Sequence, residues 1–239
     1  MSMIVPPFTE AGDQSRAQQL SMDRMYRFQR HIYDASRRFY LLGRERLIRD
    51  LNVPEHGTVL EIGCGTGRNL VKVAKAYPTA RVFGFDISDE MLKSAANAIH
   101  KADLRGRVRI AQGDALSFDG DTTFGVRSFD RVYFSYTLSM IPQWKNALEH
   151  AAAMLSADGE LHAADFGQCE KLASPLKVLL FAWLRKFHVW PCHELAAEFR
   201  RLAQVQGGLA DFADGYGGYS WHLVLSRCKP SDEGMNEGV

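Results

Sequence analysis

A short glycine-rich run is the part of this sequence whose residue types and spacing are best suited to chemistry. It spans residues 61–67, reads EIGCGTG, and joins the apolar run 58–63 to a predicted helix. Glycine lets the backbone approach a ligand closely, and the first turn of a helix offers N–H groups without partners inside the helix. The run therefore predicts a binding site for a polar part of a small molecule.

The glycine spacing and two aspartates narrow the kind of ligand. The run has Gly-x-Gly-x-Gly spacing (Gly63, Gly65, Gly67), which is neither the Gly-x-Gly-x-x-Gly of dinucleotide binders nor a P-loop. Asp86 ends the second apolar run, where a carboxylate can accept both hydroxyls of a ribose, and no Lys or Arg replaces it to bind a 2′-phosphate. Asp114 ends the third run, within reach of an adenine amino group. Together they predict a ligand that contains adenosine.

Aromatic residues form a second group of candidates, because aromatic faces attract a methylated ammonium ion. Tyr26, Tyr33 and Tyr40 recur at seven-residue intervals, which places them on one face of a helix. Others follow the fourth apolar run or gather near the last one: Tyr133, Phe134, Tyr136, Trp144, Tyr216, Tyr219 and Trp221. Tyr133 and Phe134 lie inside a buried strand, so we expect them to be core residues.

These residues need a sheet to position them. Apolar runs at 58–63, 81–87, 107–115, 130–141 and 160–166 alternate with helical patterns, and a helix (192–206) and strands near 209–212 and 220–227 follow. This alternation predicts an α/β fold with a doubly wound, mostly parallel seven-stranded sheet over residues 54–228. A ligand is then expected at the carboxyl ends of the strands.

A helical cap is predicted before the sheet, over residues 21–53. Between Met22 and Leu51 apolar residues recur at steps of three and four, and Gly43 is expected to break the segment into two helices. Residues 1–20 and 229–239 are polar and are expected to be flexible.

Charge and cysteine content exclude several classes of protein. The 29 Lys+Arg and 28 Asp+Glu give a formal net charge of +1, which excludes a strongly basic nucleic-acid binder. Residues 16–50 nevertheless hold nine arginines and four acids, a basic arm of 9 − 4 = +5. The four cysteines form no CxxC pair, which argues against a disulfide framework or a zinc site, and we expect no metal. With no signal peptide visible and no apolar run of membrane-spanning length, a cytoplasmic location is expected.

The glycine run, Asp86 and Asp114 in this order resemble the class I S-adenosylmethionine-dependent methyltransferases over roughly residues 55–227. The resemblance implies S-adenosylmethionine as cofactor and S-adenosylhomocysteine as product. It implies that Glu61 fixes the loop and the methionine end, that the three glycines line the cofactor, and that Asp86 and Asp114 bind ribose and adenine. It extends the cofactor set to Tyr33, Arg38, Asn69, Ile87, Met91, Ala115 and Ser135.

Three segments, 22–48, 61–70 and 133–144, look like the bacterial betaine-lipid N-methyltransferases over about residues 20–227. This resemblance implies three successive methylations of the amine of diacylglyceryl-homoserine, with a carboxypropyl-transferring enzyme as a partner in the pathway. Candidate substrate residues are Tyr26, Tyr40, Tyr136, Trp144, Tyr216 and Tyr219. The candidate catalytic residues are Tyr33 and Tyr136, and no residue is assigned as the proton acceptor.

A lipid substrate would explain the net positive charge of the basic arm, because Lys and Arg are attracted to an anionic leaflet. We expect peripheral association with the inner face of the membrane, although the arm's own acids offer an ordinary solvated alternative. Residues 175–191 combine an apolar run, two tryptophans and three cations, which suits either an interfacial helix or a helix that covers the substrate site.

Other functions remain open on sequence alone. The aromatic residues do not distinguish amines, so phosphatidylethanolamine or another small amine is an alternative acceptor. A quinone carbon is a weaker one, since it needs a general base. A cofactor-binding regulator without catalysis is the alternative from a different class. The segment 134–137 (FSYT) lacks the Asn/Asp-Pro-Pro-Tyr pattern of amide and nucleobase amino-group methylation.

Overall fold

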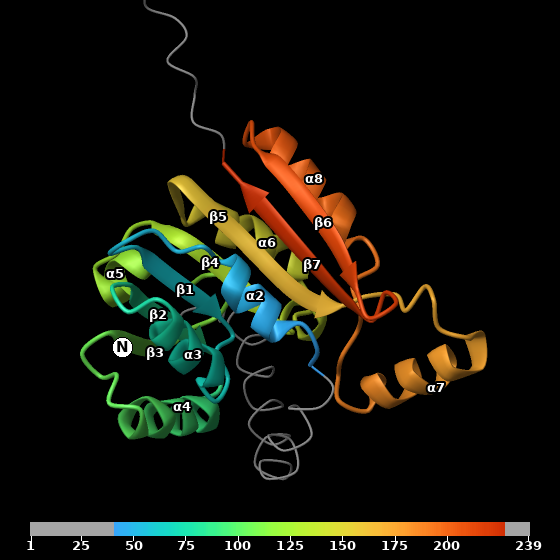
Figure 1. Ribbon diagram of the computed structural model, residues 1–239, viewed down its shortest axis with the longest axis horizontal. Helices are drawn as coiled ribbons and strands as arrows, with labels where there is room; N and C mark the ends of the chain where they lie inside the picture. The colour runs from blue at the N-terminus through green and yellow to red at the C-terminus, as the bar shows by residue number, and fades with distance from the viewer. Residues whose placement is uncertain (1–40, 228–239) are drawn as a thin grey trace, which may run out of the picture.

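A computed structural model describes residues 41–227 of the chain (Figure 1). The predicted flexible ends and the predicted cap before residue 41 lie outside the described residues. So do four candidate site residues, Tyr26, Tyr33, Arg38 and Tyr40, and most of the basic arm.

One seven-stranded sheet forms the centre of the described chain. Its strands lie in the order β3-β2-β1-β4-β5-β7-β6, and all of them run parallel except β7, which is antiparallel to both neighbours. The strands are β1 (Thr58–Ile62), β2 (Arg81–Asp86), β3 (Val108–Gln112), β4 (Phe129–Ser135), β5 (Leu155–Phe166), β6 (Leu209–Gly215) and β7 (Ser220–Ser226). The order reverses between β1 and β4, which confirms the predicted doubly wound, mostly parallel sheet.

Helices cover both faces of the sheet and close a hydrophobic core on each. The described helices are α2 (Arg44–Asp50), α3 (Arg68–Ala76), α4 (Asp89–Lys101), α5 (Gly120–Phe124), α6 (Trp144–Ala153), α7 (Ser174–Arg185) and α8 (Leu195–Val205), with a 3₁₀ turn, η1 (Leu138–Met140). Residues of α2, α3, α4 and α7 share one buried cluster, and residues of α5, α6 and α8 share the other. Most of α7 projects from the body of the molecule (Figure 1).

Local sequence explains why these elements begin and end where they do. Every residue of β1 is buried, as a central strand covered on both faces requires. Ser88 begins α4 by accepting a hydrogen bond from the Met91 N–H (3.4 Å), as expected of a serine at this position. Gly43 precedes α2 with φ +83°, so α2 begins at the predicted glycine, while the helix predicted before it lies outside the described residues.

Several predicted boundaries were wrong. The third strand ends at Gln112, so Asp114 and Ala115 lie in the loop beyond it. The fourth ends at Ser135 rather than near 141, because Tyr136 adopts φ +58° and turns the chain into η1. The sixth strand is longer than the predicted 209–212, and the five-residue α5 was not predicted.

The helix α2 is tied to the sheet rather than standing apart from it. The buried guanidinium of Arg131, on β4, donates to the carbonyls of Leu51 (2.6 Å) and Asn52 (2.9 Å). The Tyr77 hydroxyl donates to the Ile48 carbonyl (2.8 Å). These bonds fix the C-terminal end of α2 beside the end of α3, near the amino end of β1, where Arg131 pairs with Val59. Within this part of the basic arm, Arg46 and Arg49 pair with Asp50.

Candidate active site

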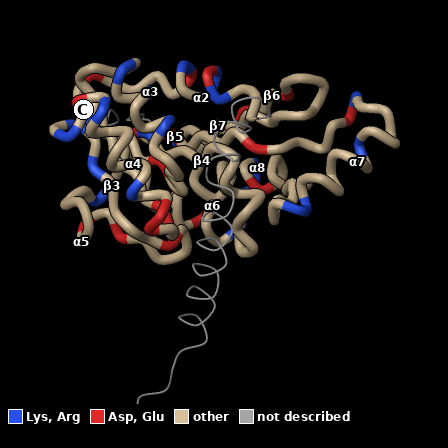
Figure 2. The backbone as a smooth tube through the Cα atoms, turned by 90° about the horizontal axis from the view of Figure 1, so that it is seen from below, with Lys and Arg blue, Asp and Glu red and all other residues tan. Residues whose placement is uncertain are grey.

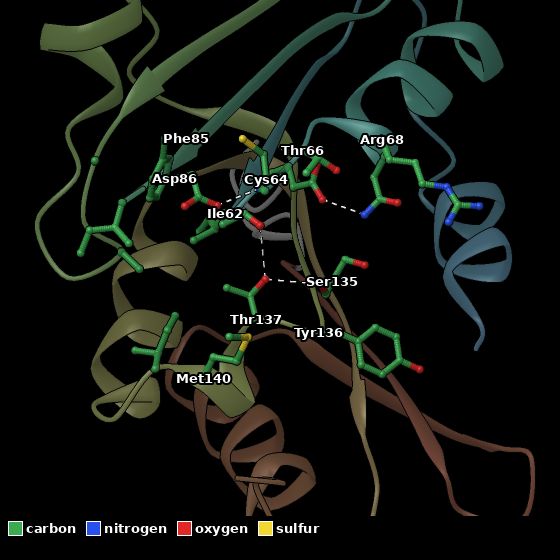
Figure 3. Close-up of a pocket in the computed structure, with 18 of the residues that line it drawn as sticks. Ile62, Cys64, Thr66, Arg68, Phe85, Asp86, Ser135, Tyr136, Thr137 and Met140 are labelled. Atoms are coloured by element: carbon green, nitrogen blue, oxygen red, sulfur yellow. Dashed lines mark hydrogen bonds between the residues drawn. The ribbon is translucent and has the colours of Figure 1, made fainter. Parts of the chain in front are cut away.

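A cavity lies at the carboxyl ends of β1, β2 and β4, where the strand order reverses (Figure 3). It holds about 990 Å³ of empty space, counting the part that is open to solvent. Ten of the predicted site residues line it: Glu61, Gly63, Gly65, Asn69, Asp86, Ile87, Asp114, Ala115, Ser135 and Tyr136. This is the position expected for a ligand in a doubly wound sheet.

The glycine turn is bonded to the end of β2. The N–H groups of Gly63 and Cys64 both donate to the Phe85 carbonyl at 2.9 Å, and the Gly65 N–H donates to Asp86 Oδ2 at 2.7 Å. Gly63 has φ +70°, and a Cβ at this position would lie 2.3 Å from Thr137 Cγ2. A side chain is therefore excluded where the turn meets the segment after β4.

The Asp86 carboxylate is held in place by the backbone and keeps the capacity to bind a ligand. Its Oδ1 accepts the Ser88 N–H at 2.9 Å, and its Oδ2 accepts from Gly65. A carboxylate has about four acceptor positions, which makes Asp86 a suitable group to accept ribose hydroxyls. Asp86 is buried and lines the cavity, as the proposed ribose contact requires.

Two predicted cofactor residues do not line the cavity. Gly67 precedes α3 with φ +74°, and a Cβ there would lie 2.9 Å from the Cβ of Ala95 on α4. Its role is therefore the close packing of α3 against α4. Met91 is buried in the first turn of α4, away from the cavity lining.

Glu61 is a strongly perturbed carboxyl group of the cavity. Its side chain is buried, Oε1 accepts a hydrogen bond from the Asn69 amide (2.8 Å), and Oε2 has no hydrogen-bonding partner among the described residues. Burial raises the pKa of Glu61 from 4.5 to about 8, against the lowering effect of Asn69. The Tyr133 hydroxyl, which is on the neighbouring strand, is also buried without a partner of good geometry.

These groups suit an adenosine cofactor that carries an ammonium group. A positive charge beside Glu61 would give Oε2 the partner that it lacks and would favour the ionised carboxylate. Asp86 and Asp114 then offer acceptors to ribose hydroxyls and to an exocyclic amine.

The other end of the cavity is formed by the segment after β4. Ser135, Tyr136, Thr137, Met140 and Ile141 line it, and the buried Ser135 hydroxyl has no hydrogen-bonding partner among the described residues. Figure 3 shows this group on the opposite side of the cavity from Asp86.

Tyr136 contributes its ring to this end rather than a proton-accepting group. Its hydroxyl donates to the Leu42 carbonyl, and burial raises the pKa of the phenol well above its ordinary value. The ring packs edge-on against Phe166 (4.7 Å between centroids), and Phe166 packs in the same way against Tyr219 (5.7 Å). Tyr136 is therefore a rigid aromatic wall, and its catalytic role stays a prediction.

The remaining aromatic candidates are not brought to the cavity. Trp144 packs against the buried cluster that contains residues of α5, α6 and α8. Tyr216 is 65% exposed. Tyr219 lies behind Phe166 and does not line the cavity.

Sequence reasoning missed a further group of lining residues: Leu41, Arg44, Ile62, Cys64, Thr66, Arg68, Phe85, Gly113, Thr137, Met140 and Ile141. Cys64 and Thr66 lie within the glycine run, so their position in the motif was the available signal. Thr137, Met140 and Ile141 were assigned to a strand, which hid their place beside the ligand.

The chain is similar to known methyltransferases in sequence and in fold. A family model described as a methyltransferase domain matches residues 59–159. A solved S-adenosylmethionine-dependent methyltransferase from Aquifex aeolicus superposes with a TM-score of 0.59 at 17% identity, over 80% of this chain and 93% of that one. The methyltransferase SibL superposes with a TM-score of 0.62 at 22% identity, over 82% and 57%. The chain therefore has the fold of the class I S-adenosylmethionine-dependent methyltransferases and matches a methyltransferase domain over residues 59–159.

Curated proteins similar to this chain are named demethylmenaquinone methyltransferases. The demethylmenaquinone methyltransferase of Geobacillus kaustophilus is 27% identical over 201 residues, 84% of this chain and 76% of the relative. The enzyme of the same name from Lactobacillus johnsonii is 26% identical over 149 residues, 62% of this chain and 57% of the relative. The chain thus spans little more than half of the second relative's length.

The described residues contain neither a candidate metal cluster nor a membrane-spanning helix. Between residues 41 and 227, no group of three or more His, Cys, Asp and Glu side chains is arranged to hold a metal ion. No helix in this range is long and apolar enough to cross a membrane.

Proposed function

We propose that this methyltransferase methylates the amine of a lipid, diacylglyceryl-homoserine, three times in succession to give the trimethylated betaine lipid. One observation carries the choice of an amine. The acceptor end of the cavity presents an aromatic ring, two apolar side chains and two hydroxyls, and none of these groups is a base near neutral pH.

The chemistry of amine methylation makes few demands of such a site. S-adenosylmethionine would supply a methyl group on a sulfonium: the lone pair of an unprotonated amine attacks the methyl carbon in line, and S-adenosylhomocysteine leaves as the thioether. The ammonium formed loses its proton to solvent before the next methylation, so no strong base is needed. The protein's task is to position the two groups and exclude water. Glu61, Asp86 and Asp114 would hold the cofactor, while the Ser135 hydroxyl would accept a hydrogen bond from an N–H of the substrate amine.

The aromatic wall favours a product that gains positive character. A quaternary ammonium has no N–H to donate, so it is recognised by aromatic faces rather than by hydrogen bonds. The Tyr136 ring is held by Phe166 and by its bond to Leu42, and it lines the end of the cavity where the growing methylated amine would lie.

The lipid part of the proposal rests on sequence resemblance. The segments 22–48 and 133–144 resemble betaine-lipid N-methyltransferases more specifically than the glycine run does. The second of them contains the acceptor end of the cavity, from Ser135 to Ile141.

Methylation of a quinone carbon is the second candidate, because the curated relatives are named demethylmenaquinone methyltransferases. That reaction requires a base to remove the ring hydroxyl proton as the carbon attacks. Among the described lining residues the only carboxylates are Glu61, Asp86 and Asp114, which are engaged with the cofactor in our proposal.

One assay distinguishes the candidates. The purified full chain is incubated with S-adenosylmethionine and, in separate detergent-dispersed samples, diacylglyceryl-homoserine, phosphatidylethanolamine or reduced demethylmenaquinone. We expect S-adenosylhomocysteine and mono-, di- and trimethylated lipid with the first acceptor alone. Turnover with only the quinone would refute the proposal.

The control is Asp86→Ala, which removes the proposed ribose acceptor and leaves the acceptor end intact. It should lose turnover with every acceptor. Cofactor binding without turnover on any acceptor would indicate a regulator and would contradict an enzymatic role.

A further inference from the structure

The first turn of α7 and the side of the helix that faces away from the core expose large apolar side chains, which together are called its outer face. Leu176, Val178 and Leu179 are 56%, 65% and 68% exposed, and Trp190, shortly after the helix, is 60% exposed. Pro175 and Ala182 are exposed on the same helix. No other helix of the described chain exposes so many large apolar side chains together.

This face is not the one by which α7 packs on the protein. The inner side consists of the buried Leu184 together with Leu180, Phe181, Trp183 and Phe187, which are partly buried against the core. A surface helix ordinarily has one apolar stripe facing the core and a polar face outward. Because α7 is apolar on both sides, its outer side requires a second apolar environment.

The charged residues of α7 and of the segment that follows it have one sign. Residues 174–191 contain three Lys or Arg and no Asp or Glu. Arg185 and Lys186 are exposed at the C-terminal end of α7, and the Lys177 ammonium lies 5.6 Å from the centre of the Phe181 ring. Figure 2 shows Lys and Arg along α7 at the edge of the molecule. Apolar side chains bordered by cations are complementary to an anionic lipid surface, into which Trp and Leu insert between charged headgroups.

The same segment is connected to the acceptor end of the cavity. The Trp190 N–H donates to the Ser139 carbonyl at 2.7 Å, and Met140 and Ile141, which follow Ser139, line the cavity. Leu184 belongs to the buried cluster that contains Tyr136, which also lines it. In Figure 1 α7 projects beyond the carboxyl end of β5, the end of the parallel strands at which the cavity lies.

We propose that the outer face of α7, with Trp190, docks on the surface of an anionic membrane and brings the acceptor end of the cavity to the lipid headgroups. The docking surface consists of Leu176, Val178, Leu179 and Trp190 with Lys177, Arg185 and Lys186. The idea that docking delivers the substrate rests on the proposed function, whereas the docking itself does not.

The test is flotation of the full chain with vesicles of phosphatidylcholine, with and without phosphatidylglycerol. We expect binding to the anionic vesicles only, with a weaker signal as salt rises from about 0.1 M to about 1 M, which shortens the Debye length from about 10 Å to about 3 Å. The double variant Leu176→Glu/Leu179→Glu should lose about tenfold or more of this binding, because two apolar anchors become anions.

Val205→Glu is the matched control, since Val205 is as exposed (71%) but ends α8, outside the docking surface. It should bind vesicles like the unaltered chain. Emission of Trp190, obtained by comparison with Trp190→Phe, should shift to shorter wavelength on the anionic vesicles.

Three outcomes would overturn the proposal. The double variant floats as well as the unaltered chain, binding is indifferent to anionic lipid, or the unaltered chain is a dimer that the double variant converts to monomer. Turnover on detergent-dispersed diacylglyceryl-homoserine separates the two hypotheses. Normal turnover by the double variant with lost flotation supports docking, whereas flotation without turnover refutes only the choice of substrate.

Discussion

Cofactor binding should release a proton from Glu61. In the cofactor-free protein burial raises the pKa of the Glu61 carboxyl to about 8, and the Asn69 amide donates a hydrogen bond to Oε1. An ammonium group placed beside Oε2 stabilises the ionised form, so the pKa of Glu61 falls when the cofactor binds. Proton release should therefore be measured while the cofactor binds. Glu61→Gln is the comparison variant, because its side chain has no proton to release.

The magnitude follows from the raised pKa. A group whose pKa is about one unit above the pH is about nine-tenths protonated, so close to one proton should be released per cofactor at pH 7. Because binding selects the ionised form, the affinity should rise about tenfold per pH unit below 8 and level off above it. The Glu61→Gln variant should bind more weakly and without this dependence.

Calorimetric titration at pH 7 measures the number of protons released per cofactor bound. The apparent binding enthalpy is determined in buffers of different ionisation enthalpy, and its slope gives the protons released. Tyr133→Phe is the control, since the neighbouring Tyr133 hydroxyl lowers the pKa of Glu61 and its loss leaves the carboxyl buried with its pKa still raised. That variant should still release a proton.

Thermal unfolding gives a second test of the raised pKa, because the stability of the cofactor-free protein should fall with rising pH whereas the cofactor affinity should rise. Glu61 is protonated in the folded, cofactor-free protein up to pH 8 and ionised in the unfolded chain above 4.5. Stability from this group is therefore present at low pH and is lost as the pH rises through 8. An enthalpy independent of buffer, or equal proton release by Glu61→Gln, would refute the reasoning.

Three further substitutions test other parts of the site and the fold. Asp86→Ala should abolish detectable cofactor binding in calorimetry while the far-ultraviolet circular dichroism stays unchanged; unaltered affinity would remove Asp86 from the site. Gly67→Ala should lower the unfolding free energy by about 1–3 kcal/mol, because the new Cβ meets Ala95 at a positive φ, with a smaller effect on cofactor affinity. Arg131→Met should cost about 3–5 kcal/mol in denaturant unfolding, since Glu160, 3.2 Å away, and the carbonyls at the end of α2 lose their partner. A cost below about 1 kcal/mol would show that α2 is held by other contacts.

The positions of Glu61 and Asp86 in the site could be predicted from the sequence because they depend only on where short buried apolar runs end. Glu61 and Asp86 close short buried runs, and in a parallel sheet such positions converge at one edge. The separation of Glu61 and Asp86 in sequence does not affect this prediction, because the parallel pairing of β1 with β2 brings the ends of the two strands together.

Other features depend on contacts that the local pattern does not encode. Gly67 has the spacing of a cofactor glycine, yet its constraint comes from Ala95, on a helix that begins beyond β2. Tyr136 was read as part of a strand, but its positive φ reverses the chain and redirects its side chain. The run 175–191 is apolar nearly throughout, so composition alone did not say which side of α7 would meet the core.

The position of β7 sets the order in which the sheet can be completed during synthesis. β6 leaves the ribosome first, yet in the described chain its strand partner is β7, which also covers the edge of β5. Until residues 220–226 emerge, β6 has no place in the sheet and β5 presents an open edge to other nascent chains. A chain terminated just before Ser220 would therefore lose two strands from the sheet, not one.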